Sequence, residues 1–143
     1  MKVLIDMSFI YAVFIEKSPN HKKAQLLLEK ILKNCQNDVF FTTNHVVQES
    51  YAVFSIRIHD ATYLNALDEF FYGETCFFEV IYIGADQIKD QAIVKIMKEN
   101  LVKPPKKALS FVDASLIYTA KFMAADKILS FDSHFENIIP YYR

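Results

Sequence analysis

Glycine and cysteine are scarce in this sequence. Two glycines occur in 143 residues, where an average composition of about 7% would give roughly ten, so few turns can depend on a positive φ angle. We therefore expect a helix-rich chain rather than an all-β fold. Cys35 and Cys76 are too few for a disulfide framework or a thiolate zinc site, and we expect both to be buried apolar residues in a reducing cytoplasm.

Long apolar runs and a strong net charge are also absent. No stretch of 18 apolar residues occurs, so we expect no membrane span. Lys2 precedes an apolar run, as in a signal peptide, but Asp6 interrupts that run and no small-residue cleavage site follows. We therefore expect a soluble, cytoplasmic protein. The net charge of −1 argues against a simple nucleic-acid-coating module, because such proteins use an overall basic field.

Apolar residues, in contrast, are abundant. Hydrophobic residues make up 52% of the chain and aromatic residues 15%. This composition excludes disorder, and a chain of this length can bury one core without disulfides or a structural metal. We therefore expect a single domain over residues 1–143. So much apolar surface in a short chain also favours a homodimer.

Short β-rich runs alternate with helix-period runs, which is the pattern of an α/β fold with a largely parallel sheet. The expected strands are Val3–Ile5, Val39–Phe41, Phe78–Ile83 and Lys127–Ser130. The expected helices are Ser18–Leu32, Asn44 to about Ile58, Ala61–Phe71, Gly84 to about Leu101, and Asp113–Ala124. These elements predict a four- or five-stranded, mainly parallel sheet that is flanked by helices on both faces.

Local signals add detail to two of these helices. Thr43 or Asn44 is expected to cap the helix that contains Glu49. The helix that starts at Gly84 is amphipathic, and its expected inner face consists of Ile88, Ala92, Ile96 and Met97. Pro104 and Pro105 then end any helix, because proline lacks the N–H that a helix interior needs.

Asp6 is the most informative residue of the sequence. No other charge occurs between Val3 and Ile15, so its carboxylate is expected to be at least partly buried. Burial of an unpaired carboxylate is costly, and Asp6 should therefore meet a cation, a metal or several N–H donors. The carboxyl end of a strand is also where open α/β sheets place ligand sites. A helix cap after the strand is the alternative, but it explains the apolar surroundings less well.

Three further acids can join Asp6. Glu49 lies in a helix near its apolar face, Asp113 lies where a helix begins, and Asp132 follows a strand by two residues. Taken alone, Asp113 is expected to be an N-cap and Asp132 a turn or cap residue. Together, acids at these places can converge in an α/β sandwich. Converging carboxylates need compensating cations, and hard oxygen ligands favour Mg²⁺ or Mn²⁺ over zinc.

Four segments carry a pattern that resembles a known family in order and spacing. These are Val3–Ser8, Gln48–Glu49, Leu109–Ala114 and Ala125–Phe135. Their sequence is similar to that of PIN domains, and among them to the short VapC-type toxins of toxin–antitoxin pairs. The resemblance covers nearly the whole chain and implies a PIN-like α/β/α sandwich. It departs at Met7, where a small hydroxyl residue is common, and at Ser130, which replaces the more usual threonine.

The resemblance implies a metal-dependent endoribonuclease that hydrolyses RNA phosphodiester bonds with metal-activated water. By this resemblance, four acids are both the catalytic residues and the ligands of Mg²⁺ or Mn²⁺: Asp6, Glu49, Asp113 and Asp132. Ser8 and Ser130 match positions that supply supporting hydrogen bonds, whereas Asp126 and Glu136 rank below Asp132. The implied role is the toxin of a VapBC-type pair, with RNA as substrate and an antitoxin as partner.

Other interpretations stay open at this stage. Lys103, Lys106 and Lys107 are candidates for RNA binding, although a solvated lysine loop fits them equally well. His45 lies four residues before Glu49 and could share its metal, but a capping or surface histidine is favoured. The other histidines, His21, His59 and His134, lack a metal-binding spacing, which disfavours zinc hydrolysis. Three functional alternatives are an RNA-processing PIN nuclease outside a toxin–antitoxin pair, an aspartate-based phosphotransfer enzyme and a non-catalytic interaction domain.

Overall fold

A computed structural model describes residues 1–34, 37–103 and 105–143. In chain order the elements are β1 (Lys2–Ile5), α1 (Met7–Phe14), α2 (His21–Asn34), β2 (Val39–Thr43), α3 (Asn44–Val53), the π-helix η1 (Phe54–Ile58), α4 (Ala61–Tyr72), β3 (Phe78–Ile81), α5 (Gln87–Glu99), α6 (Phe111–Met123), β4 (Lys127–Leu129) and the 3-10 helix η2 (Ser133–Phe135). Cys35 and Pro104 lie outside the described residues, so the expectations for them are not tested. No helix of the described ranges is long and apolar enough to cross a membrane.

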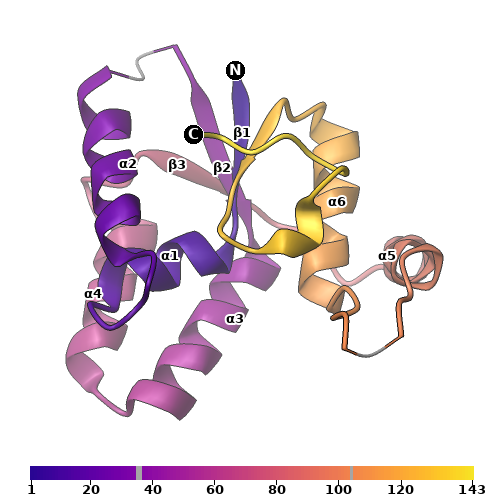
Figure 1. Ribbon diagram of the computed structural model, residues 1–143, viewed down its shortest axis with the longest axis horizontal. Coiled ribbons are helices and arrows are strands. Elements are labelled where there is room, and N and C mark those ends of the chain that lie inside the picture. The colour runs from indigo at the N-terminus through magenta and orange to yellow at the C-terminus, as the bar shows by residue number, and fades with distance from the viewer. Residues whose placement is uncertain (35–36, 104) are drawn as a thin grey trace.

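The four strands form one parallel sheet in the order β3-β2-β1-β4. Parallel neighbours need crossover connections, and such connections are right-handed in nearly all proteins. The chain moves from β1 to β3 in one direction and then returns across the sheet to β4, so the two sets of helices cover opposite faces. Figure 1 shows α1, α2 and α4 to one side of the strands, and α5 and α6 to the other. The expected α/β sandwich is confirmed.

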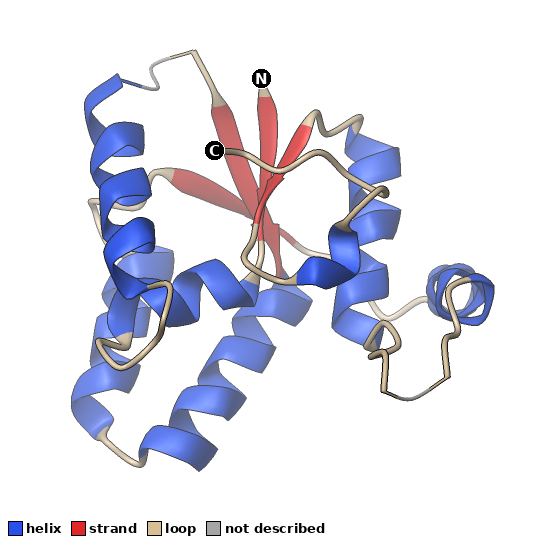
Figure 2. Cartoon of the chain, in the orientation of Figure 1, coloured by secondary structure: helices blue, strands red, loops and turns tan. Residues whose placement is uncertain are grey.

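The central strand explains why the core forms here. Val3, Leu4 and Ile5 of β1 are completely buried, because β1 has a strand on each side and helices on both faces. Phe40 and Phe41 of β2 extend this apolar layer. The central parts of β1 and β2 are therefore continuous apolar runs rather than alternating ones. Figure 2 shows the carboxyl ends of the strands directed toward the start of α1 and α3.

The first helix is not among the elements expected from the sequence. The segment from Met7 to Phe14 forms α1, whose Phe9, Ile10 and Val13 are buried. An apolar run of this kind fits a buried strand or a buried helix equally well by its periodicity. Asp6 decides between them, because its side chain accepts hydrogen bonds from the first backbone N–H groups of the helix.

The third helix changes its winding near its end. Thr43 caps α3 as expected, since its hydroxyl accepts a hydrogen bond from the Val46 N–H. The helix expected to reach Ile58 ends as regular α-helix at Val53 and continues as η1. At His59 the backbone reaches a positive φ angle of 56°, which ends the winding.

Two expectations about helix faces and starts are wrong. Ile88 was assigned to the inner face of α5, but it is 78% exposed, whereas Ile93 and Ile96 are buried. Ile88 lies in the first turn of α5, which Asp86 caps. The α6 helix starts at Phe111 and its N-cap is Ser110, so Asp113 does not open it.

Candidate metal centre

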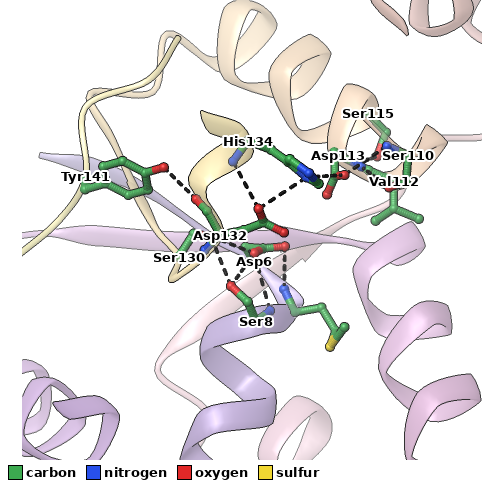
Figure 3. A network of polar contacts seen from close by, with 11 residues as sticks. Asp6, Ser8, Ser110, Val112, Asp113, Ser115, Ser130, Asp132, His134 and Tyr141 are labelled. Carbon is green, nitrogen blue, oxygen red and sulfur yellow. Dashed lines mark hydrogen bonds and ion pairs between the residues drawn. The ribbon is translucent and has the colours of Figure 1, made fainter. Parts of the chain in front are cut away.

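Asp6 follows β1 directly and is almost completely buried. Its carboxylate accepts hydrogen bonds from the backbone N–H of Met7 at 2.7 Å and of Ser8 at 3.3 Å, and from the hydroxyls of Ser8 at 2.5 Å and Ser130 at 2.7 Å (Figure 3). Burial raises the pKa of Asp6, although the two serine hydroxyls oppose this effect, and the carboxylates of Asp113 and Asp132 raise it further. Asp6 is thus a helix cap and also a member of an acidic cluster.

Ser8 and Ser130 connect the start of α1 to the turn after β4. Their hydroxyl oxygens lie 3.0 Å apart. The Ser8 hydroxyl also accepts the Phe131 N–H, and the Ser130 hydroxyl accepts the Asp132 N–H, each at 3.0 Å. These contacts fix the backbone on both sides of Asp132 relative to Asp6.

Asp113 lies at the third position of α6 and forms a capping box with Ser110. The Asp113 carboxylate accepts the Ser110 N–H at 2.9 Å, and the Ser110 hydroxyl accepts the Asp113 N–H at 3.0 Å. The simple N-cap expected for Asp113 is therefore wrong, because Ser110 has that role. The same Asp113 oxygen, Oδ2, also lies 3.2 Å from Nδ1 of His134.

His134 lies between two of the acids. Its Nδ1 is 3.2 Å from Asp113 Oδ2 and 3.2 Å from Asp132 Oδ1, as the dashed lines in Figure 3 show. Asp132 caps η2 by accepting the His134 N–H at 3.0 Å, and the Asp132 carbonyl accepts the Tyr141 hydroxyl at 2.5 Å. One ligand atom from each of Asp113, Asp132 and His134 lies within 4.8 Å of the others. Sequence spacing did not indicate His134, because its contact with Asp113, 21 residues earlier on α6, arises only from the fold.

Glu49 faces the same cluster from α3. It is half-buried, and burial together with the carboxylates of Asp6, Asp113 and Asp132 raises its pKa to about 7, while Arg57 acts in the opposite direction. The four acids singled out in the sequence thus interact with one another at the carboxyl end of the sheet. Asp126 does not join them, since its carboxylate accepts the Lys2 N–H at the opposite end of β1.

The cluster carries more negative charge than its neighbours offset. Within the described ranges, the ion-pair partner of its carboxylates is His134, and no lysine or arginine forms an ion pair with them. Several carboxylates cannot all ionise at such short range without a compensating cation. The arrangement therefore disfavours the fully ionised state of the free protein and favours a bound cation.

A cleft of about 1020 Å³ opens beside the cluster, and Ser8, Asp132 and His134 are part of its wall. Three cationic residues also line it: Arg57, Lys106 and Lys107. Lys103 is not among the lining residues. Arg57 was missed in the sequence, because only the course of η1 brings it to this cleft.

His45 does not take part in the cluster. Its ring packs edge-on against Phe111, and burial lowers its pKa while Asp90 opposes that shift. Its Nε2 is buried and has no hydrogen-bond partner among the described residues. The expectation of a capping or surface histidine is wrong, since Thr43 caps α3 and His45 is half-buried.

Solved structures with a similar fold cover nearly the whole chain. VapC20 of Mycobacterium tuberculosis, described as a sarcin-ricin loop cleaving toxin, matches with a TM-score of 0.69 and 23% identity over 94% of this chain and 93% of that one. FitAB bound to an IR36 DNA fragment matches with a TM-score of 0.63 and 15% identity, over 98% of this chain and 93% of that one. VapBC2 of Rickettsia felis, bound to a DNA fragment from its promoter, matches with a TM-score of 0.60 and 14% identity, over 99% of this chain and 98% of that one. At these identities the likeness establishes the fold.

Sequence comparison identifies the family. No curated protein matched the chain. The sequence profile described as "PIN domain" matches residues 3–139 and therefore includes all four acids of the cluster as well as His134. The fold, with its parallel sheet and its acids at the carboxyl ends of β1 and β4, agrees with that match. The chain belongs to the PIN domain family.

Proposed function

We propose that this PIN domain is a Mg²⁺- or Mn²⁺-dependent endoribonuclease whose catalytic acids and metal ligands are Asp6, Glu49, Asp113 and Asp132. The observation that carries this proposal is the convergence of four carboxylates beside an open cleft, with no ion pair to a lysine or arginine within the described ranges and with Arg57 only partly offsetting their charge. The donor set fits the metal, because hard carboxylate oxygens are the ligands that these ions prefer. A bound ion supplies an activated water and positive charge at the scissile phosphate.

The residues of the chain prepare this chemistry by holding the carboxylates in place. Asp6 is fixed by four hydrogen-bond donors, and Asp113 by its capping box. The charge of Glu49 depends on pH within the physiological range, since its pKa is raised to about 7. A cation near Glu49 favours its ionised form, so metal binding and loss of the Glu49 proton support each other.

The cationic residues of the cleft support RNA as the substrate class. Arg57, Lys106 and Lys107 line the cleft together with Asp132 and His134. We propose that these cations contact phosphates on either side of the bond that is cut, because phosphate contacts dominate sequence-independent binding. Lys103, outside the cleft lining, has a smaller role in this proposal.

We further propose that the protein is the toxin of a VapBC-type toxin–antitoxin pair and that an antitoxin is its partner. The similarity in fold to VapC20 and to the VapBC2 and FitAB complexes supports this role. An RNA-processing nuclease would use the same site, so the neighbouring genes are needed to distinguish a toxin from an RNA-processing enzyme. A neighbouring short gene whose product binds this chain and stops its RNA cleavage supports the toxin role, and its absence favours RNA processing.

The exchange Asp113→Asn tests the metal site. Asparagine keeps the size of the side chain and an oxygen that can accept the Ser110 N–H, but it removes one negative charge. We expect RNA cleavage to fall by at least about a hundredfold, since even indirect supports of a metal often contribute tenfold or more. Mg²⁺ or Mn²⁺ should raise the melting temperature of the wild type much more than that of the variant. In EDTA the variant should melt at or above the wild type, because one repelling carboxylate is gone.

The matched control is Ser110→Ala, which breaks the same capping box from the other side. It should lower the free energy of unfolding by about 1 kcal/mol, and with it the melting temperature, and it should leave the metal-induced shift intact. If Asp113→Asn and Ser110→Ala respond alike to metal and Asp113→Asn still cleaves RNA, Asp113 is a helix cap only, and the proposed function loses its main support.

A further inference from the structure

His134 contacts two acids of the cluster, and the proposed site of four carboxylates assigns it no role. Its Nδ1 is directed at Asp113 and Asp132 together. We propose that His134 Nδ1 is a direct ligand of the ion that Asp113 and Asp132 hold, and that this nitrogen makes the site select Mn²⁺ over Mg²⁺. This inference rests on the metal site of the proposed function and specifies its ligands and its ion.

The distances match those around one ion. Nδ1 lies 3.2 Å from an oxygen of each aspartate, and the three ligand atoms lie within 4.8 Å of one another. In an octahedral site with bonds of about 2.1 Å, neighbouring ligand atoms lie about 3.0 Å apart and opposite ones about 4.2 Å apart. Both distances from Nδ1 to an aspartate oxygen therefore match the spacing of neighbouring ligands around one ion.

The three side chains are also held in this arrangement. The exposed fraction of the side chain is 14% for His134, 12% for Asp113 and 33% for Asp132. Asp132 caps η2, and Phe135, the residue after His134, is completely buried and anchors that turn in the core. The imidazole therefore does not have to be recruited from solvent, which reduces the entropy lost on metal binding.

The chemistry of the donor set determines which ion is preferred. Mg²⁺ favours oxygen ligands throughout and gives up its waters reluctantly, so a nitrogen offers it little. Mn²⁺ stands at the start of the series of transition ions that bind nitrogen more readily, and it still accepts carboxylates. A site with two aspartates and one imidazole therefore distinguishes the two ions, whereas a site of carboxylates alone does so less.

A hydrogen-bonding role of His134 makes a different prediction. If Nδ1–H only orients Asp113 and Asp132, its loss weakens binding of both ions by a similar factor, because the ligands that it positions are shared. If Nδ1 is a ligand, its loss weakens Mn²⁺ binding selectively. We expect His134→Gln to lower the Mn²⁺ affinity at least about tenfold and the Mg²⁺ affinity less than about twofold.

The decisive experiment uses the full chain loaded with Mn²⁺ and needs no RNA. Counting free Mn²⁺ by electron paramagnetic resonance measures binding, and electron spin-echo envelope modulation detects a nitrogen bonded to the ion. Expression with ¹⁵N-histidine in the unmutated chain should convert the ¹⁴N modulation to that of ¹⁵N. The modulation should vanish in His134→Gln and persist in the control His59→Asn, which replaces an exposed histidine at a positive φ angle that asparagine tolerates.

The outcomes separate this inference from the proposed function. Bound Mn²⁺ with histidine nitrogen modulation that depends on His134 supports the inference. Bound Mn²⁺ without nitrogen modulation, or with modulation that survives His134→Gln, overturns it and leaves the carboxylate metal site standing. Absence of Mn²⁺ and Mg²⁺ binding at millimolar concentration overturns both.

Discussion

At the scale of single residues, the carboxylate of Asp6 combines two roles that oppose each other in energy. As the cap of α1 and the acceptor of two serine hydroxyls, it is stabilised in its ionised form. As a buried member of an acidic cluster, it is destabilised in that form, and the net effect is a raised pKa. A divalent cation removes this conflict, because it compensates the charge without disturbing the hydrogen bonds.

Ser130→Ala should weaken the metal site through Asp6. The buried Ser130 hydroxyl donates to Asp6 at 2.7 Å and accepts the Asp132 N–H at 3.0 Å, so its loss should cost about 1–3 kcal/mol of stability. The pKa of Asp6 should rise further, since a hydrogen bond that lowers it is gone. Thermal melts should show a reduced stabilisation by Mn²⁺. Ser130→Thr, the residue more usual in the family, keeps the hydroxyl and should retain the response; equal losses in both variants would contradict this account.

Glu49 should make the metal-free protein less stable as the pH rises. Its pKa is raised from 4.5 in the unfolded chain to about 7 in the folded state, so the folded state binds more protons between these values. The free energy of unfolding therefore falls from about pH 4.5 to about pH 7 and this contribution is constant above. In EDTA, Glu49→Gln should flatten the fall of melting temperature over that window. An unchanged slope would show that the folded state does not raise the pKa of Glu49.

At the scale of elements, η1 continues α3 and brings a cationic side chain of that segment to the cleft. A π-turn at the end of an α-helix is uncommon and occurs often at functional sites. Here the five residues from Phe54 to Ile58 place Phe54 in the core and Arg57 at the cleft. Arg57 also partly opposes the rise in the pKa of Glu49, which lies on α3 two turns earlier. One helix thus carries an acid of the cluster and a cation of the cleft.

The segment between α5 and α6 offers a matched pair of lysines. Lys107 lines the cleft beside His134, whereas Lys103 does not, although both are exposed. Lys107→Ala should weaken RNA binding and reduce the slope of log affinity against log salt by about 0.7 for single-stranded RNA, the value of one phosphate contact. Lys103→Ala should leave both nearly unchanged. Binding titrations at several salt concentrations measure this, and identical slopes for the two variants would argue against the proposed RNA path.

The sequence predicts most elements because their signals are local. The capping of α3 by Thr43 and the fully apolar β1 follow from side-chain chemistry within a few residues. The missed features depend on packing. The apolar run of α1 fits a strand as well as a helix, and the hydrogen bonds to Asp6 distinguish the two. The exposure of Ile88 depends on which side chains of α5 are buried by packing, which its helical spacing alone does not determine.

The site divides in the same way. The resemblance and the odd position of Asp6 pointed to the four acids, which the structure brings into one interacting group. Arg57 was not predicted, because only the course of η1 brings it to the cleft. His134 contacts Asp132 two residues before it, but its contact with Asp113 on α6 depends on packing that no spacing in the sequence encodes. His134 does lie in one of the segments that resemble PIN domains, which was the signal available.

At the scale of the whole molecule, the site lies beside β1, where successive strands stop being added on one side of the sheet and β4 is added on the other. From β1 the chain builds outward to β2 and β3, and later it places β4 on the other side of β1. Open α/β sheets bind their ligands beside the carboxyl ends of strands at such a switch point. Asp6 follows β1 and Asp132 follows β4, so two acids flank the point at which the connections diverge.

We expect the protein to form a homodimer, because apolar side chains are abundant and several are exposed. Leu26, Ile56 and Phe122 are between 68% and 78% exposed, and burial of such side chains between two copies stabilises a dimer. Light scattering at micromolar concentration should give about twice the chain mass of 16.6 kDa. A monomer at that concentration would contradict this expectation and leave these side chains to an antitoxin.

End-group analysis of cleaved RNA tests the central claim most directly, since it reports the chemistry that we propose for the carboxylate cluster. The purified protein with Mg²⁺ or Mn²⁺ should cut a labelled single-stranded or looped RNA and leave 5′-phosphate and 3′-hydroxyl ends, because metal-activated water attacks the phosphorus. A 2′-deoxy substitution at the cleaved nucleotide should not abolish the cut, and EDTA should. Products that end in a 2′,3′-cyclic phosphate, or cleavage that continues in EDTA, would contradict the proposal that these acids hold a metal for hydrolysis.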